Sequence, residues 1–264
     1  MRCKKPSTTA QTGEIMLYNI LDADSAKQTL NEVFQQTNST EIGYKPWPSA
    51  GQYLGSDMLK FRCRHITTCD DGGNSFRKLG ILTPIDVLAN QDIPLASFIE
   101  QHTGIRYKDH HFYHGKNKLS QVCVSSIKLE DGGDNRVNAF LNGGGKLGEY
   151  DGYDQRPEII FNCAADAGMH LSEILNIEKR WQKRHKPYAI TFDVSFIKVY
   201  SIAGYYAGDE FEEDEIDFFT IMQRLMELAL KVSSGKSVDK IPITLVENYT
   251  VPPDDIVSIT PLSE

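Results

Sequence analysis

The sequence predicts an α+β fold in which a twisted, mainly antiparallel central sheet is flanked by peripheral helices and followed by a short C-terminal segment. Three observations predict it. The stretch KPYAITFDVSFIKVYS alternates apolar and polar residues, other stretches space their apolar residues at helical intervals, and prolines divide the last segment of the chain. A length of 264 residues is enough to bury one large core, with or without a small appendage.

The clearest strand is YAITFDVSFIKVYSI, residues 188–202. Its period of two gives one apolar and one polar face. Such a strand covers a core with one side facing water, which is the commoner case, or lines a membrane pore with one side on lipid. The residues of the apolar face are Ile190, Phe192, Val194 and Phe196, and those of the polar face are Thr191, Asp193 and Ser195.

Two further strands are predicted in the middle of the chain, at 119–130 and 158–168, where β-branched and apolar residues gather. A glycine-rich loop over 142–157 separates them. We expect both strands to share one twisted, largely antiparallel sheet with 188–202.

Helices are predicted where apolar residues recur at three- and four-residue intervals. Ser25 and Ser172 are candidate N-caps for the first and third, and Pro94 and Gly104 bound the second. The stretch 41–55 is turn-rich because Pro46 and Pro48 exclude a helix. The predicted helices lie within 17–36, at 94–104, at 171–185 and at 217–232.

The C-terminal segment, residues 241–264, contains no Lys or Arg and many β-branched apolar residues. Four prolines in it forbid a long helix and disfavour a central strand. We therefore expect it to lie across the body in a groove, connected by the polar linker 233–240. The alternative is an ordinary edge strand that ends the fold.

Composition limits the function. A net charge of −8 argues against a nucleic-acid-binding protein, which usually presents a basic face. No apolar stretch reaches the ~18 residues of a transmembrane helix, and the basic N-terminus is not followed by the apolar region of a secretory signal. Five scattered cysteines suit a reduced, cytoplasmic protein.

No set of residues in the sequence makes a convincing catalytic or metal site, so we expect neither an enzyme nor a metal cofactor. The stretch DHHFYHG (109–115) resembles a turn or strand more than a ligand-bearing helix, and CRHITTC (63–69) spaces its cysteines too widely for a zinc knuckle. Cys163 with His170 is only nominally a dyad, because the thiol falls in a predicted strand.

Cys3 lies in the polar run MRCKKPSTTA, between basic residues. It is either an incidental terminal cysteine or an acylated thiol, whose neighbours Arg2, Lys4 and Lys5 would meet an anionic lipid surface.

The N-terminal cysteine, the turn GQYLGSDMLK, the glycine-rich loop and the strand KPYAITFDVSFIKVYS together resemble the bacterial gasdermins. The resemblance spans most of the chain as a layout of short matches. The acidic stretch 209–217 and residues 109–118 have no counterpart in it.

The resemblance implies an autoinhibited pore-forming protein. Residues 1–235 would form the pore-forming domain, and 236–264 the linker and C-terminal autoinhibitory peptide. A caspase-like or trypsin-like protease would cut near Lys236, Asp239 and Lys240. The freed body, monomeric at rest in the cytoplasm, would oligomerise among inner-membrane lipids and kill the cell as antiphage defence, without a nucleic-acid partner.

The resemblance also implies roles for individual residues. Cys3 would carry a palmitoyl chain, with no other cofactor. The strand of Ile190, Phe192, Val194 and Phe196 would span the membrane in the pore. The apolar side chains of the tail would dock on the body, and these are Ile241, Ile243, Leu245 and Val246. The rival hypothesis is an α+β binding or hydrolytic module without pore activity, in which the tail is an ordinary edge element.

Overall fold

The computed structural model of the chain describes residues 16–20, 22, 24, 28, 59–119, 135–142, 154–202, 225, 228, 231, 234, 236 and 240–262. Cys3, Asp239, the turn-rich stretch 41–55, the acidic stretch 209–217 and almost all of the predicted strand 119–130 lie outside these residues.

The predicted fold class is confirmed, because the protein is α+β with a mainly antiparallel sheet of seven strands. The strand order is β10-β7-β2-β6-β9-β8, and β1 pairs with β2 in the one parallel pairing of this sheet among the described residues. The strands are β1 (Met16–Tyr18), β2 (Leu59–Cys69), β6 (Asn138–Phe140), β7 (Lys186–Ser195), β8 (Val199–Ile202), β9 (Pro242–Leu245) and β10 (Ile256–Pro261).

The longest pairing joins β2 and β7, which run antiparallel from Lys60 opposite Ser195 to Cys69 opposite Lys186. Both strands alternate. In β2 the apolar residues Leu59, Phe61 and Cys63 are buried, and the cationic residues between them are partly exposed. The sequence LKFRCRHITTC therefore carries the same period-2 pattern that predicted β7.

The predicted strand 188–202 is two strands rather than one. The 3₁₀ turn η2 (Phe196–Lys198) interrupts it and sends the chain from β7 to β8. Four Cα steps reach at most about 14 Å, whereas four strand spacings in a flat sheet measure about 19 Å. The sheet must therefore be strongly bent to bring β8 close to the end of β7.

The tail does not lie across a groove as expected, since it supplies two strands of the sheet. β9 is an interior strand between β6 and β8, and β10 is an edge strand on β7. Pro242 is tolerated because it is the first residue of β9, where a missing N–H costs least.

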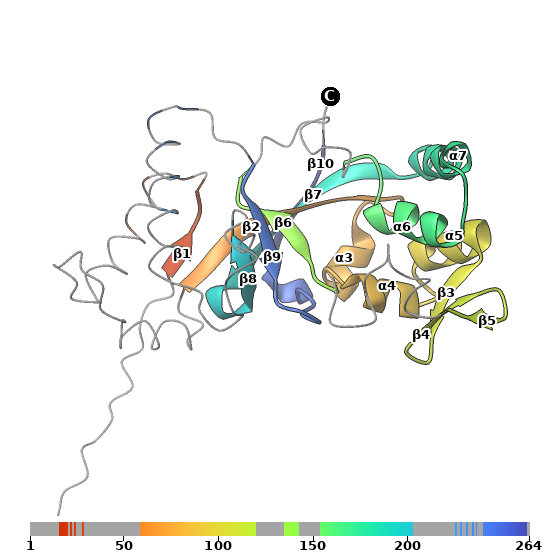
Figure 1. Cartoon of the computed structure of the whole chain (residues 1–264). Helices are drawn as coiled ribbons and strands as arrows, with labels where there is room; N and C mark the ends of the chain where they lie inside the picture. Colours follow the sequence, from red (N-terminus) through yellow and green to blue (C-terminus); the bar gives the residue numbers. More distant parts are fainter. Residues whose placement is uncertain are drawn as a thin grey trace, which may run out of the picture.

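Helices gather at one end of the sheet, as Figure 1 shows, together with a small sheet of β3 (Ile105–Lys108), β4 (His111–His114) and β5 (Asn117–Lys118). The helices are α3 (Asn74–Leu79), α4 (Pro84–Ala89), α5 (Pro94–Thr103), α6 (Glu158–Asp166) and α7 (Leu171–Gln182). The predicted helix from Pro94, closed by Gly104 at φ 71°, is confirmed.

The predicted strand 158–168 is wrong, because these residues form α6. Ile160, Cys163 and Ala164 lie three and four positions apart and face the core together, which is helical spacing. The N-cap of α7 is His170 rather than Ser172, and its backbone N–H donates to Glu173 Oε2 at 2.9 Å.

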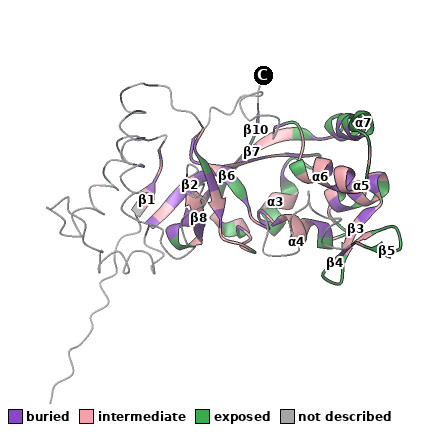
Figure 2. Cartoon of the chain, viewed as in Figure 1, coloured by how far each residue is buried: buried purple, intermediate pink, exposed green. Residues whose placement is uncertain are grey.

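Two main hydrophobic clusters result. One fills the bent sheet, and the other joins the helices to the small sheet through Ile99, Phe112, Ile160 and Trp181. Figure 2 shows buried and intermediate residues along the long strands and an exposed side on α7. Leu225 and Leu228, within the predicted helix 217–232, are helical and buried.

Candidate functional site

The tail and the apolar face of β7 belong to one hydrophobic cluster. Ile243 and Leu245 of β9 are fully buried, as are Phe192 and Val194 of β7. The other predicted members of the two groups, Ile190, Phe196 and Ile241, are buried in the same cluster, whereas Val246 is half-buried. The structure therefore brings together the proposed autoinhibitory contacts and the candidate membrane-spanning strand.

Backbone hydrogen bonds fix the tail on both of its sides. β9 pairs antiparallel with β6 through Ile243 opposite Ala139, and with β8 through Leu245 opposite Val199. Farther along, Val251 exchanges two bonds of 3.0 Å with Ile81, just before α4. Removing the tail would leave β6 and β8 without the partner that lies between them.

Three asparagines of the segment Asn135–Asn142 hold the tail by their side chains, and the sequence analysis did not identify them. Asn142 Oδ1 accepts from the Ile241 backbone N–H at 2.8 Å, and Asn138 Oδ1 accepts from the Thr244 hydroxyl at 2.9 Å. The available signal in the sequence is the stretch NRVNAFLN (135–142), which places three asparagines within eight residues.

Asn135 is the most buried of the three, at 3% exposure. Its Nδ2 donates to Asn248 Oδ1 at 2.7 Å, and its Oδ1 accepts from the Ile85 N–H at 2.9 Å. Asn248 has a left-handed backbone, φ 59°, which asparagine tolerates better than most residues. Asn135 thus joins the turn after β9 to the start of α4.

Gly80 lets the tail backbone approach closely. A Cβ at Gly80 would stand 1.9 Å from the Val251 carbonyl oxygen, and the residue has φ 78°. Only glycine satisfies both conditions, because it has no Cβ and adopts positive φ without strain.

The opposite face of the β2–β7 pair is charged around Lys60 and Arg62 and apolar around Ile66 and Ala189. Arg62 holds Asp193 across the strands with two parallel bonds, Nε to Oδ1 at 2.8 Å and Nη2 to Oδ2 at 2.9 Å. The bond to Asp193 raises the pKa of Arg62 despite partial burial. Lys60 Nζ lies 3.4 Å from Oδ1 of Asp255, the residue just before β10. This ion pair joins the charged part of the face to the tail.

The linker residues that the structure describes are accessible. Lys236 is exposed and Lys240 is partly exposed, directly before the buried Ile241. Cys3 and Asp239 lie outside the described residues.

The histidines and cysteines that the sequence offered as candidate metal ligands or nucleophiles belong to ordinary structural elements. The stretch DHHFYHG forms a turn and β4, in line with the expectation of a turn or strand. Cys63, Cys69 and Cys163 are free and buried, and burial raises the pKa of each thiol, to about 11 for Cys69. Thiols with raised pKa values are poor nucleophiles at neutral pH. Across the described part of the chain, no three His, Cys, Asp or Glu side chains are grouped to hold a metal.

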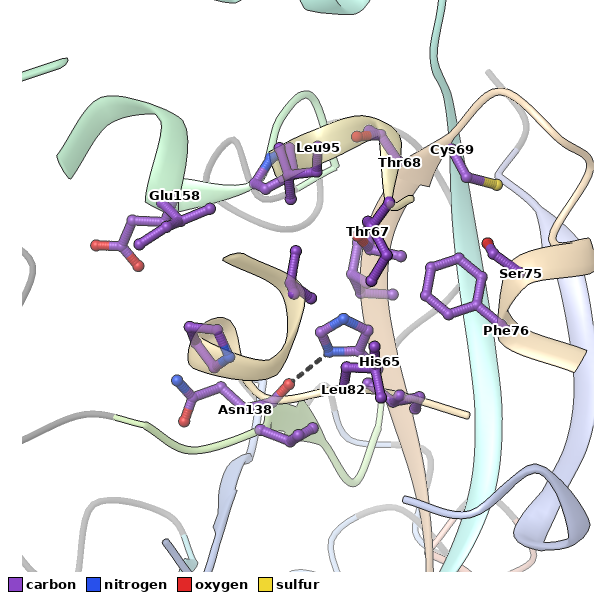
Figure 3. A pocket seen from close by; sticks show the side chains of 18 of the residues that line it. His65, Thr67, Thr68, Cys69, Ser75, Phe76, Leu82, Leu95, Asn138 and Glu158 are labelled. Atoms are coloured by element: carbon purple, nitrogen blue, oxygen red, sulfur yellow. Dashed lines mark hydrogen bonds between the residues drawn. The ribbon is translucent and has the colours of Figure 1, made fainter. Parts of the chain in front are cut away.

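A cavity of about 590 Å³ lies between the sheet and the helices (Figure 3). β2 and β6 form one wall, and residues of α3 to α6 form the other. Its lining is mostly apolar, with Phe76, Leu82 and Leu95 among the helical-side residues and the His65 ring on the sheet side. No pattern in the sequence indicates this cavity, because its walls come from distant parts of the chain.

Comparison with known proteins leaves the family open, since no family model, no curated protein and no solved structure matches the chain. Within the described residues, every helix is too short or too polar to cross a membrane.

Proposed function

We propose that the protein is an autoinhibited pore-forming protein of the gasdermin type. In this proposal a caspase-like or trypsin-like protease cuts in 233–240, the tail leaves, and the body oligomerises in the bacterial inner membrane and kills the cell as antiphage defence. One observation supports it above all. The buried side chains of the tail share a single hydrophobic cluster with the apolar face of β7.

Loss of the tail would have two physical consequences. The hydrophobic cluster that contains the apolar face of β7 would lose the buried side chains of the tail, and β6 and β8 would lose the strand between them. Uncovered apolar surface favours lipid over water. Unpaired strand edges are templates for pairing with a second chain. Both consequences favour oligomers in a membrane over a monomer in the cytoplasm.

The tail is held more firmly than a docked peptide. Ile241, Ile243, Leu245 and Val251 are at most 3% exposed. At about 1.5–3 kcal/mol each, their burial contributes roughly 6–12 kcal/mol before ordering costs. Cutting the linker removes the high effective concentration of the attached tail. We propose that lipid then competes for the uncovered face and completes the release.

The sharpest test replaces residues 233–239 with the recognition sequence of a site-specific protease. The protein is mixed with dye-loaded vesicles of bacterial inner-membrane lipids, and dye release is followed before and after the protease is added. The control variant carries a scrambled sequence of equal length. We expect release only from the cleavable variant, together with a shift to large oligomers.

Two results contradict the proposal. One is a cleaved protein that stays monomeric with intact vesicles, and the other is dye release of equal size from the scrambled control. Expression of residues 1–240 in a bacterium adds a test that does not depend on cleavage, because a pore-forming body kills without its tail.

We further propose that Cys3 carries a thioester-linked palmitoyl chain, flanked by basic residues that meet the lipid surface. Burial of about 0.8 kcal/mol per CH₂ makes such a chain a strong membrane anchor. Intact mass spectrometry of protein from its native host tests this. We expect an added mass that hydroxylamine removes and that Cys3→Ser abolishes, and the bare mass in the native host would refute it.

The rival hypothesis of a binding module without pore activity gains support from the cavity beside β2. The same truncation separates the two hypotheses, because a binding module does not become toxic when it loses its tail.

A further inference from the structure

We propose that the cavity beside β2 binds an uncharged small molecule with an apolar body and a hydroxyl group, and that this hydroxyl donates a hydrogen bond to Nε2 of His65. The proposal is independent of pore formation, and it assigns a ligand class to a site to which the tail contributes Pro242.

The size and walls of the cavity suit a small organic ligand. Its volume of about 590 Å³ falls within the 300–1,000 Å³ typical of ligand pockets. Leu82, Val87 and Leu95 line the helical side, and Val137 and Ala139 line the side of β6. Binding there would move the apolar surface of a ligand out of water, which is favourable.

His65 supplies the polar contact, and its geometry fixes its hydrogen-bonding role. Nδ1 lies 2.8 Å from the backbone carbonyl oxygen of Asn138, which can only accept, so Nδ1 carries the proton. In the neutral ring Nε2 is then an acceptor. Figure 3 shows the ring inside the cavity, bonded to Asn138 through one nitrogen. Burial lowers the pKa of His65 and so favours the neutral ring. The bond to Asn138 acts in the opposite direction but has the smaller effect.

Most of the charged side chains around the cavity have partners, and Glu158, which also lines it, is exposed at the start of α6. Arg156 pairs with Glu178, and the Arg136 guanidinium lies 3.4 Å from the centre of the Tyr200 ring. Asp71 accepts from the backbone N–H groups of Gly73 and Ser75. An anion would meet the carboxylate of Glu158 or have to displace one of these contacts, and a cation would lose its hydration against a mostly apolar lining, whereas an uncharged ligand incurs neither cost.

An accepting Nε2 also selects among uncharged ligands. A hydroxyl donates to it, whereas an ether or ester oxygen has no proton to give. A ligand that covers this acceptor without offering a donor removes its bond with water, so molecules without a donor are disfavoured.

The test compares two isomers, 1-decanol and methyl nonyl ether, which have the same formula and differ in the hydroxyl. Binding to the full chain is measured by titration calorimetry at pH 7.5. We expect decanol to bind about fivefold more tightly, as one neutral hydrogen bond allows. His65→Phe should remove the preference while both isomers still bind.

A second pair of variants tests the location. Leu82→Trp places a larger side chain in the cavity and should abolish binding of both isomers. Its control, Leu175→Trp, changes an exposed residue of α7 outside the lining and should leave both affinities unchanged.

Three results overturn the proposal. They are the absence of measurable decanol binding to the wild-type chain, equal affinity for the two isomers, and unchanged binding in Leu82→Trp. The first two need only the wild-type protein, so a variant that fails to fold does not rescue the proposal.

Discussion

The side chain of Asn135 holds the tail against the helical part of the protein. It bonds Asn248 on one side and Ile85 on the other, and it is almost fully buried. We expect Asn135→Ala to lower the free energy of unfolding by roughly 2 kcal/mol, because the Ile85 N–H and the Asn248 side chain both lose a hydrogen bond worth about 1 kcal/mol. Urea denaturation measures this change.

The matched control is Thr244→Val, which removes the exposed hydroxyl bonded to Asn138. We expect it to cost less than half as much, because water replaces the lost partner. Equal losses in the two variants would mean that Asn135 has no special role.

His65 makes stability depend on pH in a definite direction. Burial lowers the pKa of the folded-state imidazole below its ordinary 6.5, so the unfolded chain binds the proton more readily. The contribution of neutral His65 to the free energy of unfolding is complete above pH 6.5 and is lost as the pH falls below that value.

We therefore expect the free energy of unfolding, measured in urea between pH 7.5 and 5.5, to fall more steeply for the wild type than for His65→Gln. Glutamine keeps a donor for the Asn138 carbonyl and does not titrate. Parallel profiles would show that His65 is as easily protonated in the folded protein as in the unfolded chain.

At the scale of elements, the contact between the α3–α4 connection and the tail depends on Gly80. In Gly80→Ala the new Cβ would meet the Val251 carbonyl oxygen at 1.9 Å, so the tail backbone has to move. Gly72→Ala is the matched control, since Gly72 has φ 69° and no atom lies within 4 Å of its added Cβ.

We expect Gly72→Ala to lower the free energy of unfolding by about 1–2 kcal/mol, because alanine is strained at positive φ. Gly80→Ala should lower it by at least twice as much. Trypsin should also cut Gly80→Ala faster than Gly72→Ala in the linker before Ile241. Indistinguishable stability and cutting rates would mean that the tail does not depend on this close approach.

At the scale of the whole molecule, the tail completes the core of the sheet. Ile243→Asp would place an unpaired charge at a fully buried position, which the fold tolerates only by releasing β9. We expect a loss of more than 4 kcal/mol and, if the pore proposal holds, toxicity in a bacterium without any protease.

Thr244→Asp is its control in the same strand, because Thr244 faces the other way and is partly exposed. We expect that variant to remain harmless and to lose less than about 1 kcal/mol. A harmless Ile243→Asp that leaks no dye from vesicles would count against a latch formed by β9.

The sequence determined the features that depend on local pattern. The alternation of 188–202 predicted β7 and its buried face, and Pro94 and Gly104 predicted both ends of α5. The α+β class followed from such patterns. Where the prediction was wrong, as for α6, a short apolar run fitted both periods, and only packing against α7 and α5 selects the helix.

The tertiary structure alone decided the place of the tail, the break at η2 and the existence of the cavity. Pro242 argued against an interior strand, yet β9 is interior, because β6 and β8 offer edges on both sides and proline is harmless at the first residue. The asparagine contacts to the tail join residues up to 113 positions apart, and the cavity walls combine residues from His65 to Pro242. Such contacts leave no local pattern in the sequence, because they depend on which residues lie close together in the folded chain. The bending of the sheet decides which residues these are.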